Sequence, residues 1–179
     1  MGFSEGLLKA VKACGYQSVT PIQQQAIPVI RTGVDLLASA QTGTGKTAAF
    51  ALPILDMLEK TGVNENNSSQ RTVRALILTP SRELAAQVAN NINDYSQFLP
   101  LKSGVVYGGG KMPSQSNMLK QGVDVLVATP GRLLEHLALR NVDLSHVKYV
   151  DLDEADRMLD MGFLKDIERL FAVIKQRHQ

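Results

Sequence analysis

The stretch Ala40-Gln41-Thr42-Gly43-Thr44-Gly45-Lys46-Thr47 decides how this chain is expected to fold. It follows a short apolar run at residues 35–40, typical of a β-strand, and precedes a helix-period segment at 48–58. When a strand is followed by a glycine-rich turn and then by a helix, the backbone N–H groups of the turn can surround phosphate oxygens. The positive end of the helix dipole then faces the same anion. The sequence therefore predicts a phosphate-binding loop in an α/β protein.

The residues of this loop suit a nucleoside triphosphate with its magnesium ion. Lys46 can reach the β- and γ-phosphates, and the Thr47 hydroxyl can bind Mg²⁺. The alternative is a glycine-rich turn with a solvated lysine, and Ala40 stands where the general pattern has its first glycine. The position between strand and helix favours nucleotide binding. The expected nucleotide contacts are Gln41, Thr42, Gly43, Thr44, Gly45, Lys46 and Thr47.

The rest of the chain alternates apolar runs with helix-period segments, which is typical of βαβ units around a mostly parallel sheet. Strands are predicted at 35–40, 73–79, 103–107, 124–129 and 147–152. They show little polar alternation, which indicates burial on both faces. Helices are predicted after Ser4, Ser81 and Pro130, and Gly15 can end the first with a positive φ. We expect one α/β domain over residues 1–179, a mostly parallel β-sheet sandwiched by helices.

Composition excludes several classes of protein. A chain of 179 residues with 44% apolar content suits one globular domain and argues against a disordered chain. It has neither a membrane-length apolar stretch nor a signal peptide, so we expect a cytoplasmic protein without a membrane partner. One cysteine and three scattered histidines give no metal-ligand spacing, so a metal must use oxygen ligands. A net charge of +2 permits a polyanionic partner without arguing for one. Residues 61–71 are expected to form a loop.

Two acidic residues follow the last predicted strand. Open α/β sheets bind ligands at the carboxyl ends of their strands, so Asp153 is expected to hold Mg²⁺, directly or through water. Glu154 is expected to orient or deprotonate an attacking water. The alternative is that both acids merely begin a helix, where they suit its dipole. Combined with the phosphate loop, the pattern favours catalysis, with Lys46, Asp153 and Glu154 as the catalytic residues.

Asp153-Glu154-Ala155-Asp156 is also the tetrapeptide that names the DEAD-box ATP-dependent RNA helicases, and the chain resembles this family over nearly its whole length. The family's motifs recur in the family's order: Gly15-Tyr16 with Thr20-Pro21-Ile22-Gln23, then Ala40–Thr47, Pro80-Ser81-Arg82-Glu83-Leu84, Gly108-Gly109 and Thr129-Pro130-Gly131-Arg132. The segments Gln-Gln-Gln-Ala-Ile-Pro and Arg-Met-Leu-Asp-Met-Gly-Phe are most similar to sequences of the bacterial RhlE-type branch. The resemblance implies a RecA-like P-loop NTPase fold that uses ATP and Mg²⁺.

The resemblance also implies adenine recognition by the first motif. The Gln23 amide carries a donor and an acceptor, so it can pair with adenine N6 and N7. Tyr16 is expected either to stack on the base or simply to pack. The alternative for Gln23 is a capping box with Thr20 and a proline at the first helical position, which uses the same amide. The motif match favours adenine recognition.

The resemblance further implies that three other motifs contact the sugar-phosphate backbone of RNA, independently of base sequence. Each follows a predicted strand, and each taken alone has a turn-and-cap alternative in which Ser81 or Thr129 caps a helix. The chain has no tryptophan and 5% aromatic residues, so it offers little for base stacking. The expected RNA contacts are Pro80, Ser81, Arg82, Gly108, Gly109, Thr129, Pro130, Gly131 and Arg132.

Some features depart from the family pattern. Asp151 stands where members have an aliphatic residue, and because a buried lone carboxylate is costly, a partner or an exposed position is expected. Ser81 replaces threonine and keeps the hydroxyl. The Ser/Thr-Ala-Thr motif and the second RecA-like domain are absent, so we expect a fragment that binds nucleotide, hydrolyses it slowly and unwinds nothing alone.

The expected partners are RNA and the second RecA-like domain, and candidate protein partners include ribosome-assembly or RNA-decay proteins. Two alternatives stay open: the ATPase domain of a DNA helicase or translocase, and a non-enzymatic module whose nucleotide state is recognised by a partner.

Overall fold

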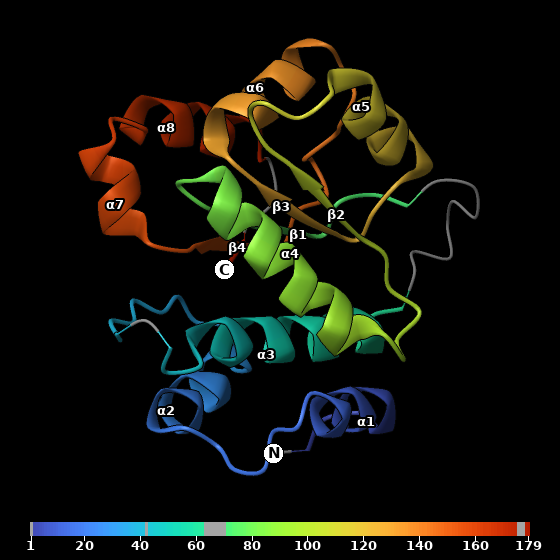
Figure 1. The fold of residues 1–179 in the computed structure, drawn as a ribbon, viewed down its shortest axis with the longest axis vertical. Helices are drawn as coiled ribbons and strands as arrows, with labels where there is room; N and C mark the ends of the chain where they lie inside the picture. The colour runs from blue at the N-terminus through green and yellow to red at the C-terminus, as the bar shows by residue number, and fades with distance from the viewer. Residues whose placement is uncertain (1, 42, 63–70, 175–177) are drawn as a thin grey trace. The chain divides into compact units, whose positions relative to one another are not determined.

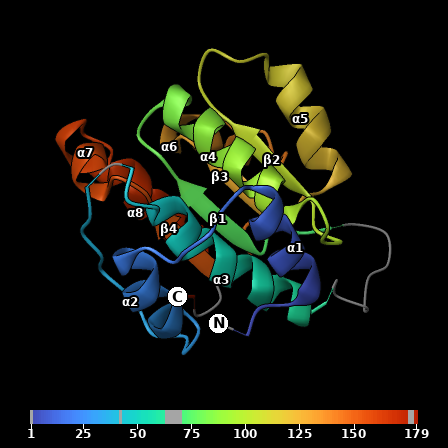
Figure 2. The ribbon, with the colours of Figure 1, turned by 60° about the horizontal axis from the view of Figure 1, so that its bottom comes forward.

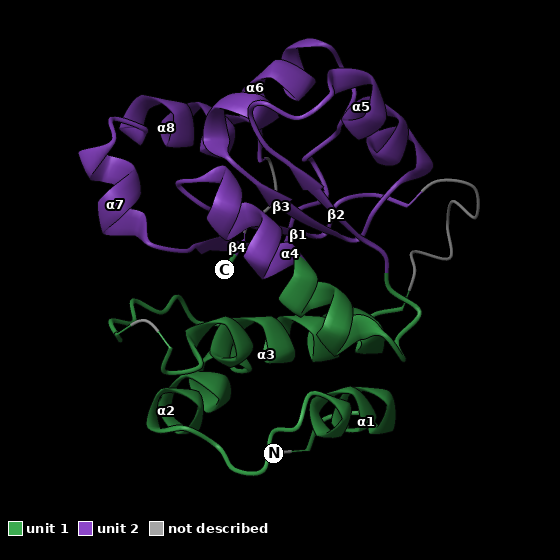
Figure 3. Ribbon diagram, viewed as in Figure 1, with its two compact units in different colours: residues 1–63, 90–101, 179 green, residues 64–89, 102–178 purple. Residues whose placement is uncertain are grey.

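The computed structural model describes residues 2–41, 43–62, 71–174 and 178–179. The chain forms two compact units (Figure 3). Unit 1 takes residues 1–63, 90–101 and 179, and unit 2 takes residues 64–89 and 102–178. The predicted phosphate loop belongs to unit 1, whereas the acidic pair and the three turns expected to contact RNA belong to unit 2.

Unit 2 is built on a parallel sheet of four strands in the order β2-β3-β1-β4 (Figure 1). The strands are β1 (Ala75–Leu78), β2 (Ser103–Val106), β3 (Val125–Ala128) and β4 (Tyr149–Leu152). All three strand pairs are parallel. Each strand falls inside a segment predicted from its Val, Leu and Ile content, so the α/β fold with a parallel sheet is confirmed.

Helices flank this sheet. The helices after the strands are α4 (Arg82–Ser96), α5 (Met112–Gln121), α6 (Pro130–Ala138), α7 (Ala155–Asp160) and α8 (Leu164–Val173). α4 begins in unit 2 and ends in unit 1, and α5 lies beside β2 (Figure 2). No helix among the described residues combines the length and the apolar character needed to cross a membrane.

The core of unit 2 lies on one face of the sheet. Leu76 and Leu126 of the central strands are buried there with Leu133 of α6, Met158 of α7 and Leu170 of α8. The alternate side chains of the two central strands are buried as well: Ala75, Ile77, Val125 and Val127. Burial on both faces explains why these strands are continuously apolar in the sequence.

The described residues of unit 1 form α1 (Glu5–Ala13), α2 (Pro21–Ile30) and α3 (Lys46–Lys60), together with the end of α4. The Ser4 hydroxyl accepts a hydrogen bond from the Leu7 N–H and so caps α1, as predicted. Gly15 follows that helix with a φ of +77°, which confirms its role in ending it. α2 packs against α3 through a small cluster of buried Ala26, Ile30 and Ala49.

The prediction of a strand at residues 35–40 is wrong for this structure. The segment has no regular secondary structure, and Leu37 is 96% exposed. A strand needs a neighbour to take its backbone hydrogen bonds, and the sheet order among the described residues includes no strand from this segment. Most of the predicted loop at 61–71 lies outside the described residues.

Unit 2 also contains a buried ionic cluster that the sequence pattern did not reveal. Asp124, immediately before β3, is 1% exposed. Its Oδ1 accepts hydrogen bonds from Arg74 Nε at 3.2 Å and Nη2 at 2.8 Å, and its Oδ2 accepts from the Lys102 N–H at 2.9 Å and from Arg71. The carboxylate thus joins the segments that lead into β1, β2 and β3.

Asp151 lies inside β4, in register with Ile77 of β1. It is half-buried and has an interaction partner. The residue is not without a partner, although its buried Oδ2 makes no hydrogen bond within the described part of the chain.

Candidate functional site

The predicted phosphate loop leads directly into α3. Gly43 and Gly45 have φ values of +81° and +86°, a conformation that favours glycine, and Gly45 is the N-cap of the helix. No described side chain caps this helix, so its first N–H groups can donate to a bound anion. The Thr44 hydroxyl donates to the Gln41 carbonyl at 2.7 Å and stabilises the turn. Thr42 lies outside the described residues.

Lys46 and Thr47 are the first two residues of α3, and both are partly buried. The helix start therefore offers a cation, a hydroxyl oxygen and N–H donors within one turn. These groups fit a triphosphate with Mg²⁺, because Mg²⁺ takes hard oxygen ligands from side chains and phosphates.

Gln23 touches this loop through its side-chain amide. Its Oε1 accepts from the Thr20 N–H at 3.1 Å, and the Thr20 hydroxyl accepts from the Gln23 N–H at 3.4 Å, which completes the predicted capping box. Its Nε2 donates to the Gly45 carbonyl at 3.2 Å. These contacts use one of the two oxygen lone pairs and one of the two N–H donors of the amide, so its remaining capacity is compatible with the adenine contact, which stays a prediction.

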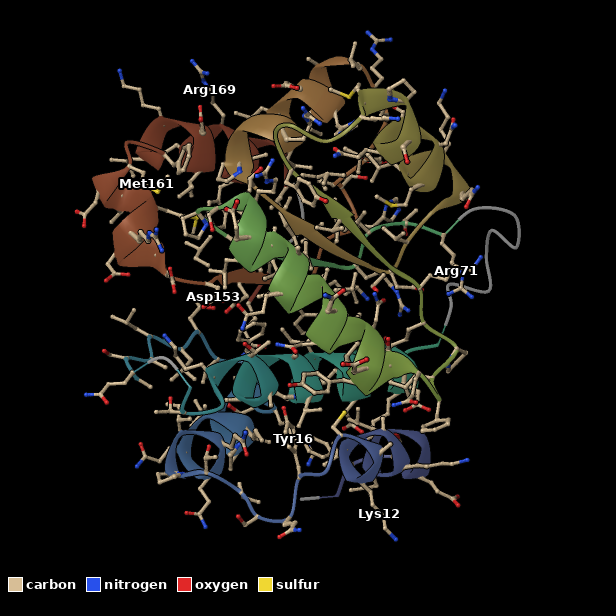
Figure 4. All side chains as sticks on the ribbon, in the orientation of Figure 1. Lys12, Tyr16, Arg71, Asp153, Met161 and Arg169 are labelled. Atoms are coloured by element: carbon tan, nitrogen blue, oxygen red, sulfur yellow. The ribbon has the colours of Figure 1, made fainter. Side chains whose placement is uncertain are left out.

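Tyr16 follows α1 with its ring partly exposed (Figure 4). Its hydroxyl lies 2.7 Å from the hydroxyl of Tyr95, and the two rings are tilted at a centroid distance of 6.1 Å. Burial and this hydrogen bond raise the pKa of Tyr95. The packing alternative for Tyr16 is thus present in the structure, and its exposed face leaves stacking on a base as a prediction.

In unit 2, four turns leave the sheet at the same edge. Leu78 of β1 is in register with Ala128 of β3 and Leu152 of β4, and Ala128 is in register with Val106 of β2. The next residues continue this alignment, because the Thr129 N–H donates to the Val106 carbonyl and the Asp153 N–H to the Leu78 carbonyl. All four strands therefore end at one carboxyl edge, where open α/β sheets bind ligands.

The acidic pair stands at this edge. Asp153 is partly buried where β4 leads toward α7 (Figure 4). Glu154 has a φ of +54°, a left-handed conformation that costs a non-glycine residue on the order of 1 kcal/mol or more. Its Oε2 lies 3.4 Å from Arg157 Nη1. Strain at a carboxylate on the ligand edge is a feature that often accompanies function.

The predicted RNA-contacting turns lie together at the same edge. A methyl group added at Gly109 would come within 3.2 Å of Arg82 Nη1, so the Arg82 guanidinium lies beside the double glycine. Arg132 Nη1 donates to the Gly110 carbonyl at 3.0 Å. The side chain of Arg82 is 57% exposed and that of Arg132 is 11% exposed.

The helix starts at this edge differ in how they are capped. The Ser81 hydroxyl accepts from the Leu84 N–H at 3.2 Å, so the cap predicted as the alternative role of Ser81 is present. Pro130 opens α6 as predicted, but the Thr129 hydroxyl makes no cap hydrogen bond. The first turn of α6 therefore keeps N–H groups that a phosphate oxygen can accept from.

Two buried polar residues beside these turns were not predicted from the sequence: Gln115 of α5 and His136 of α6. Gln115 Oε1 lies 3.1 Å from both His136 Nε2 and Arg132 Nη1. A polar residue among the apolar positions of the helix predicted after Pro130 was the available signal for His136. No helix was predicted at 112–121, so the sequence offered no face on which to place Gln115.

Known proteins with similar sequences and structures identify the family. The family model described as DEAD/DEAH box helicase matches residues 20–179. The chain is 45% identical to ATP-dependent RNA helicase CshA of Limosilactobacillus reuteri, over 95% of this chain and 33% of that protein. It is also 45% identical to DEAD-box ATP-dependent RNA helicase RhpA of Helicobacter pylori, over 100% of this chain and 35% of that protein.

A crystal structure of a hypothetical ATP-dependent RNA helicase from Sulfolobus tokodaii matches 97% of this chain and 48% of its own, with a TM-score of 0.85 and 36% identity. The chain thus spans about a third of the length of the two curated relatives. Because relatives with different names match at the same identity, the RhlE-type branch stays a prediction. The family match covers most of the chain, and the solved relative confirms the RecA-like arrangement, so this chain belongs to the DEAD/DEAH box helicase family.

Proposed function

We propose that this chain is a RecA-like ATP-binding domain over residues 1–179 of an ATP-dependent RNA helicase, which couples ATP hydrolysis to local RNA duplex unwinding. Its main support is that the acidic pair Asp153-Glu154 leaves the sheet at the same carboxyl edge as the three turns that resemble the family's RNA motifs. RNA binding at this edge can be coupled to the position of the catalytic acid, because both lie at the ends of short, rigid strands of one sheet.

In this proposal the loop 41–47 wraps the phosphates of ATP, and Lys46 binds the β- and γ-phosphates. Thr47 and Asp153 are the residues that would hold Mg²⁺, Asp153 directly or through water. Mg²⁺ would shield the charge of the phosphate oxygens. Glu154 accepts a proton from the attacking water or orients it.

Gln23 and Tyr16 recognise adenine in the same proposal. Gln23→Ala is expected to raise the dissociation constant for ATP by roughly tenfold and to reduce the preference for ATP over GTP, because a bidentate amide pair with a base is worth ~1–3 kcal/mol. Binding is measured by titration calorimetry with both nucleotides. Gln24→Ala is the matched control, since Gln24 is the exposed neighbour on α2. Unchanged affinity and preference in Gln23→Ala would rule out the adenine role.

RNA is proposed to bind along the carboxyl edge through its sugar-phosphate backbone. The exposed Arg82, the backbone of Gly108-Gly109 and the uncapped start of α6 at 129–132 supply the donors. These groups read phosphate and ribose, and 2′-hydroxyl contacts would distinguish RNA from DNA.

Arg82→Ala is expected to weaken RNA binding by roughly three- to tenfold and to reduce the slope of log affinity against log salt by about one, as for one lost phosphate contact. Fluorescence anisotropy with a single-stranded RNA at several salt concentrations measures both. Arg169→Ala is the control, because Arg169 is an exposed arginine that also pairs with an acid on its own helix. Equal salt slopes for Arg82→Ala and the unchanged protein would remove Arg82 from the RNA surface.

The second RecA-like domain, candidate partners in ribosome assembly or RNA decay, and a cytoplasmic location belong to this proposal as well. ATP hydrolysis by the full-length protein, measured with RNA and with DNA of the same sequence, tests it. We expect stimulation by RNA above that by DNA. Equal stimulation by DNA would favour a DNA translocase, and no stimulation by either would favour a nucleotide-dependent interaction module.

A further inference from the structure

A buried polar network in unit 2 connects two of the turns at the carboxyl edge. Its centre is Gln115, which is buried and points its amide at the loop that carries the double glycine. Gln115 Nε2 donates to the Tyr107 carbonyl at 3.1 Å, and Gln115 Oε1 accepts from Arg132 Nη1 at 3.1 Å. The same oxygen lies 3.1 Å from Nε2 of the fully buried His136.

The chemistry fixes the orientation of each group. Arg132 has only donors, so the Gln115 oxygen must face it and the Gln115 nitrogen must face the Tyr107 carbonyl. His136 then donates from Nε2, and its Nδ1 accepts from Asn141 Nδ2 at 3.1 Å. Burial, together with the nearby Arg132 charge, lowers the pKa of His136. The ring is therefore a neutral, defined tautomer.

The network holds both ends of the double-glycine turn. Tyr107 and Gly110 flank Gly108-Gly109, and their carbonyls accept from Gln115 and from Arg132 respectively. A side chain at Gly110 would collide with the Gln115 amide, so the loop backbone rests directly on it. Because Arg132 and His136 lie on α6, the same hydrogen bonds set the spacing between this turn and the uncapped start of α6.

We infer that Gln115 is a positioning residue for RNA binding: with Arg132 and His136 it fixes the Gly108-Gly109 turn and the start of α6 at the spacing that lets both donate to one RNA backbone. Gln115 and His136 are buried and act through these turns. The Arg132 guanidinium faces inward and serves the same purpose, while its backbone belongs to the RNA surface. The inference rests on the proposed RNA-binding function and adds residues that the family motifs quoted above do not include.

The test measures, in the full-length protein, whether a substitution changes the RNA dependence of ATP hydrolysis without changing ATP binding or turnover. Gln115→Met keeps the side-chain length and removes all three hydrogen bonds. The RNA concentration at half-maximal ATPase stimulation is expected to rise roughly tenfold, the factor for one or two weakened hydrogen bonds. The KM for ATP and the turnover number at saturating RNA are expected to change by less than about twofold. Gln121→Met, at an exposed position of the same helix, is the control and should change none of these values.

A second variant covers the case in which Gln115→Met does not fold. Gln115→Glu keeps an acceptor for Arg132 and His136 but places a carboxylate oxygen against the Tyr107 carbonyl, so a rise of at least roughly threefold in the same RNA concentration is expected, again without a change in ATP binding. A folded variant with unchanged RNA dependence would overturn the inference. So would parallel loss of RNA response, ATP binding and turnover, since that indicates a general structural role. If RNA does not stimulate the unchanged protein, the proposed function fails first; if it does, only the role of Gln115 is at stake.

Discussion

Replacing Glu154 by glutamine is expected to lower the turnover number of RNA-stimulated ATP hydrolysis by about 10³-fold, while the affinity for ATP stays within about threefold. The amide keeps the size of the side chain but cannot accept a proton from the attacking water. Since glutamine tolerates the left-handed backbone of position 154 no worse than glutamate does, the turn after β4 is expected to persist. Steady-state ATPase and nucleotide titrations of the full-length protein measure both quantities.

Glu168→Gln is the matched control for this prediction. Glu168 is an exposed glutamate on α8 of the same unit, and its replacement should leave turnover unchanged. If Glu154→Gln retains turnover within about threefold of the unchanged protein, the acidic pair merely begins α7. The interaction-module alternative would then gain support.

The largest stability effect is expected at Asp124. Asp124→Ala should lower the free energy of unfolding by ~3–5 kcal/mol, the usual cost of removing one partner from a buried ion pair. The substitution leaves the buried guanidinium of Arg74 without its carboxylate and the Lys102 N–H without its acceptor. Urea unfolding followed by circular dichroism measures the change.

Asp160→Ala provides the comparison, because Asp160 is exposed at the end of α7 and surface changes of this kind usually stay within ~0.5 kcal/mol. A loss below about 1 kcal/mol in Asp124→Ala would mean that water or rearranged side chains replace the carboxylate. The cluster would then not be what joins the starts of the three strands.

The parts of the fold that local rules determine were predictable from sequence. The Ser4 cap, the capping box of Thr20 and Gln23 and the positive φ of Gly15 each depend on neighbouring residues alone. The buried strands were found because parallel strands covered on both faces are apolar throughout. Their order in the sheet was not predicted, since it depends on contacts between distant segments.

The strand predicted at 35–40 was wrong because strand pairing depends on distant segments. Its apolar run suits a strand, but a strand also needs a partner, and pairing cannot be seen in a single segment. The polar cluster around Asp124 and the network around Gln115 were missed for the same reason. Asp124 bonds to groups 22 to 53 residues away in the chain, and Gln115 bonds to groups 8 to 21 residues away. The catalytic roles were predicted from the phosphate loop and the acidic pair, and the RNA-binding roles from motif resemblance. What the structure adds is the common edge at which the unit 2 motifs end.

A crystal structure of this chain with Mg²⁺ and a non-hydrolysable ATP analogue would show whether Lys46, Thr47 and Asp153 surround one nucleotide. We expect Lys46 Nζ to contact the terminal phosphates and Thr47 Oγ1 to bind the metal ion. We also expect the Asp153 carboxylate to lie within roughly 5 Å of the metal ion, directly bound or through one water. A nucleotide bound away from residues 41–47, or an Asp153 carboxylate more than about 10 Å from the metal ion, would contradict the proposed nucleotide site.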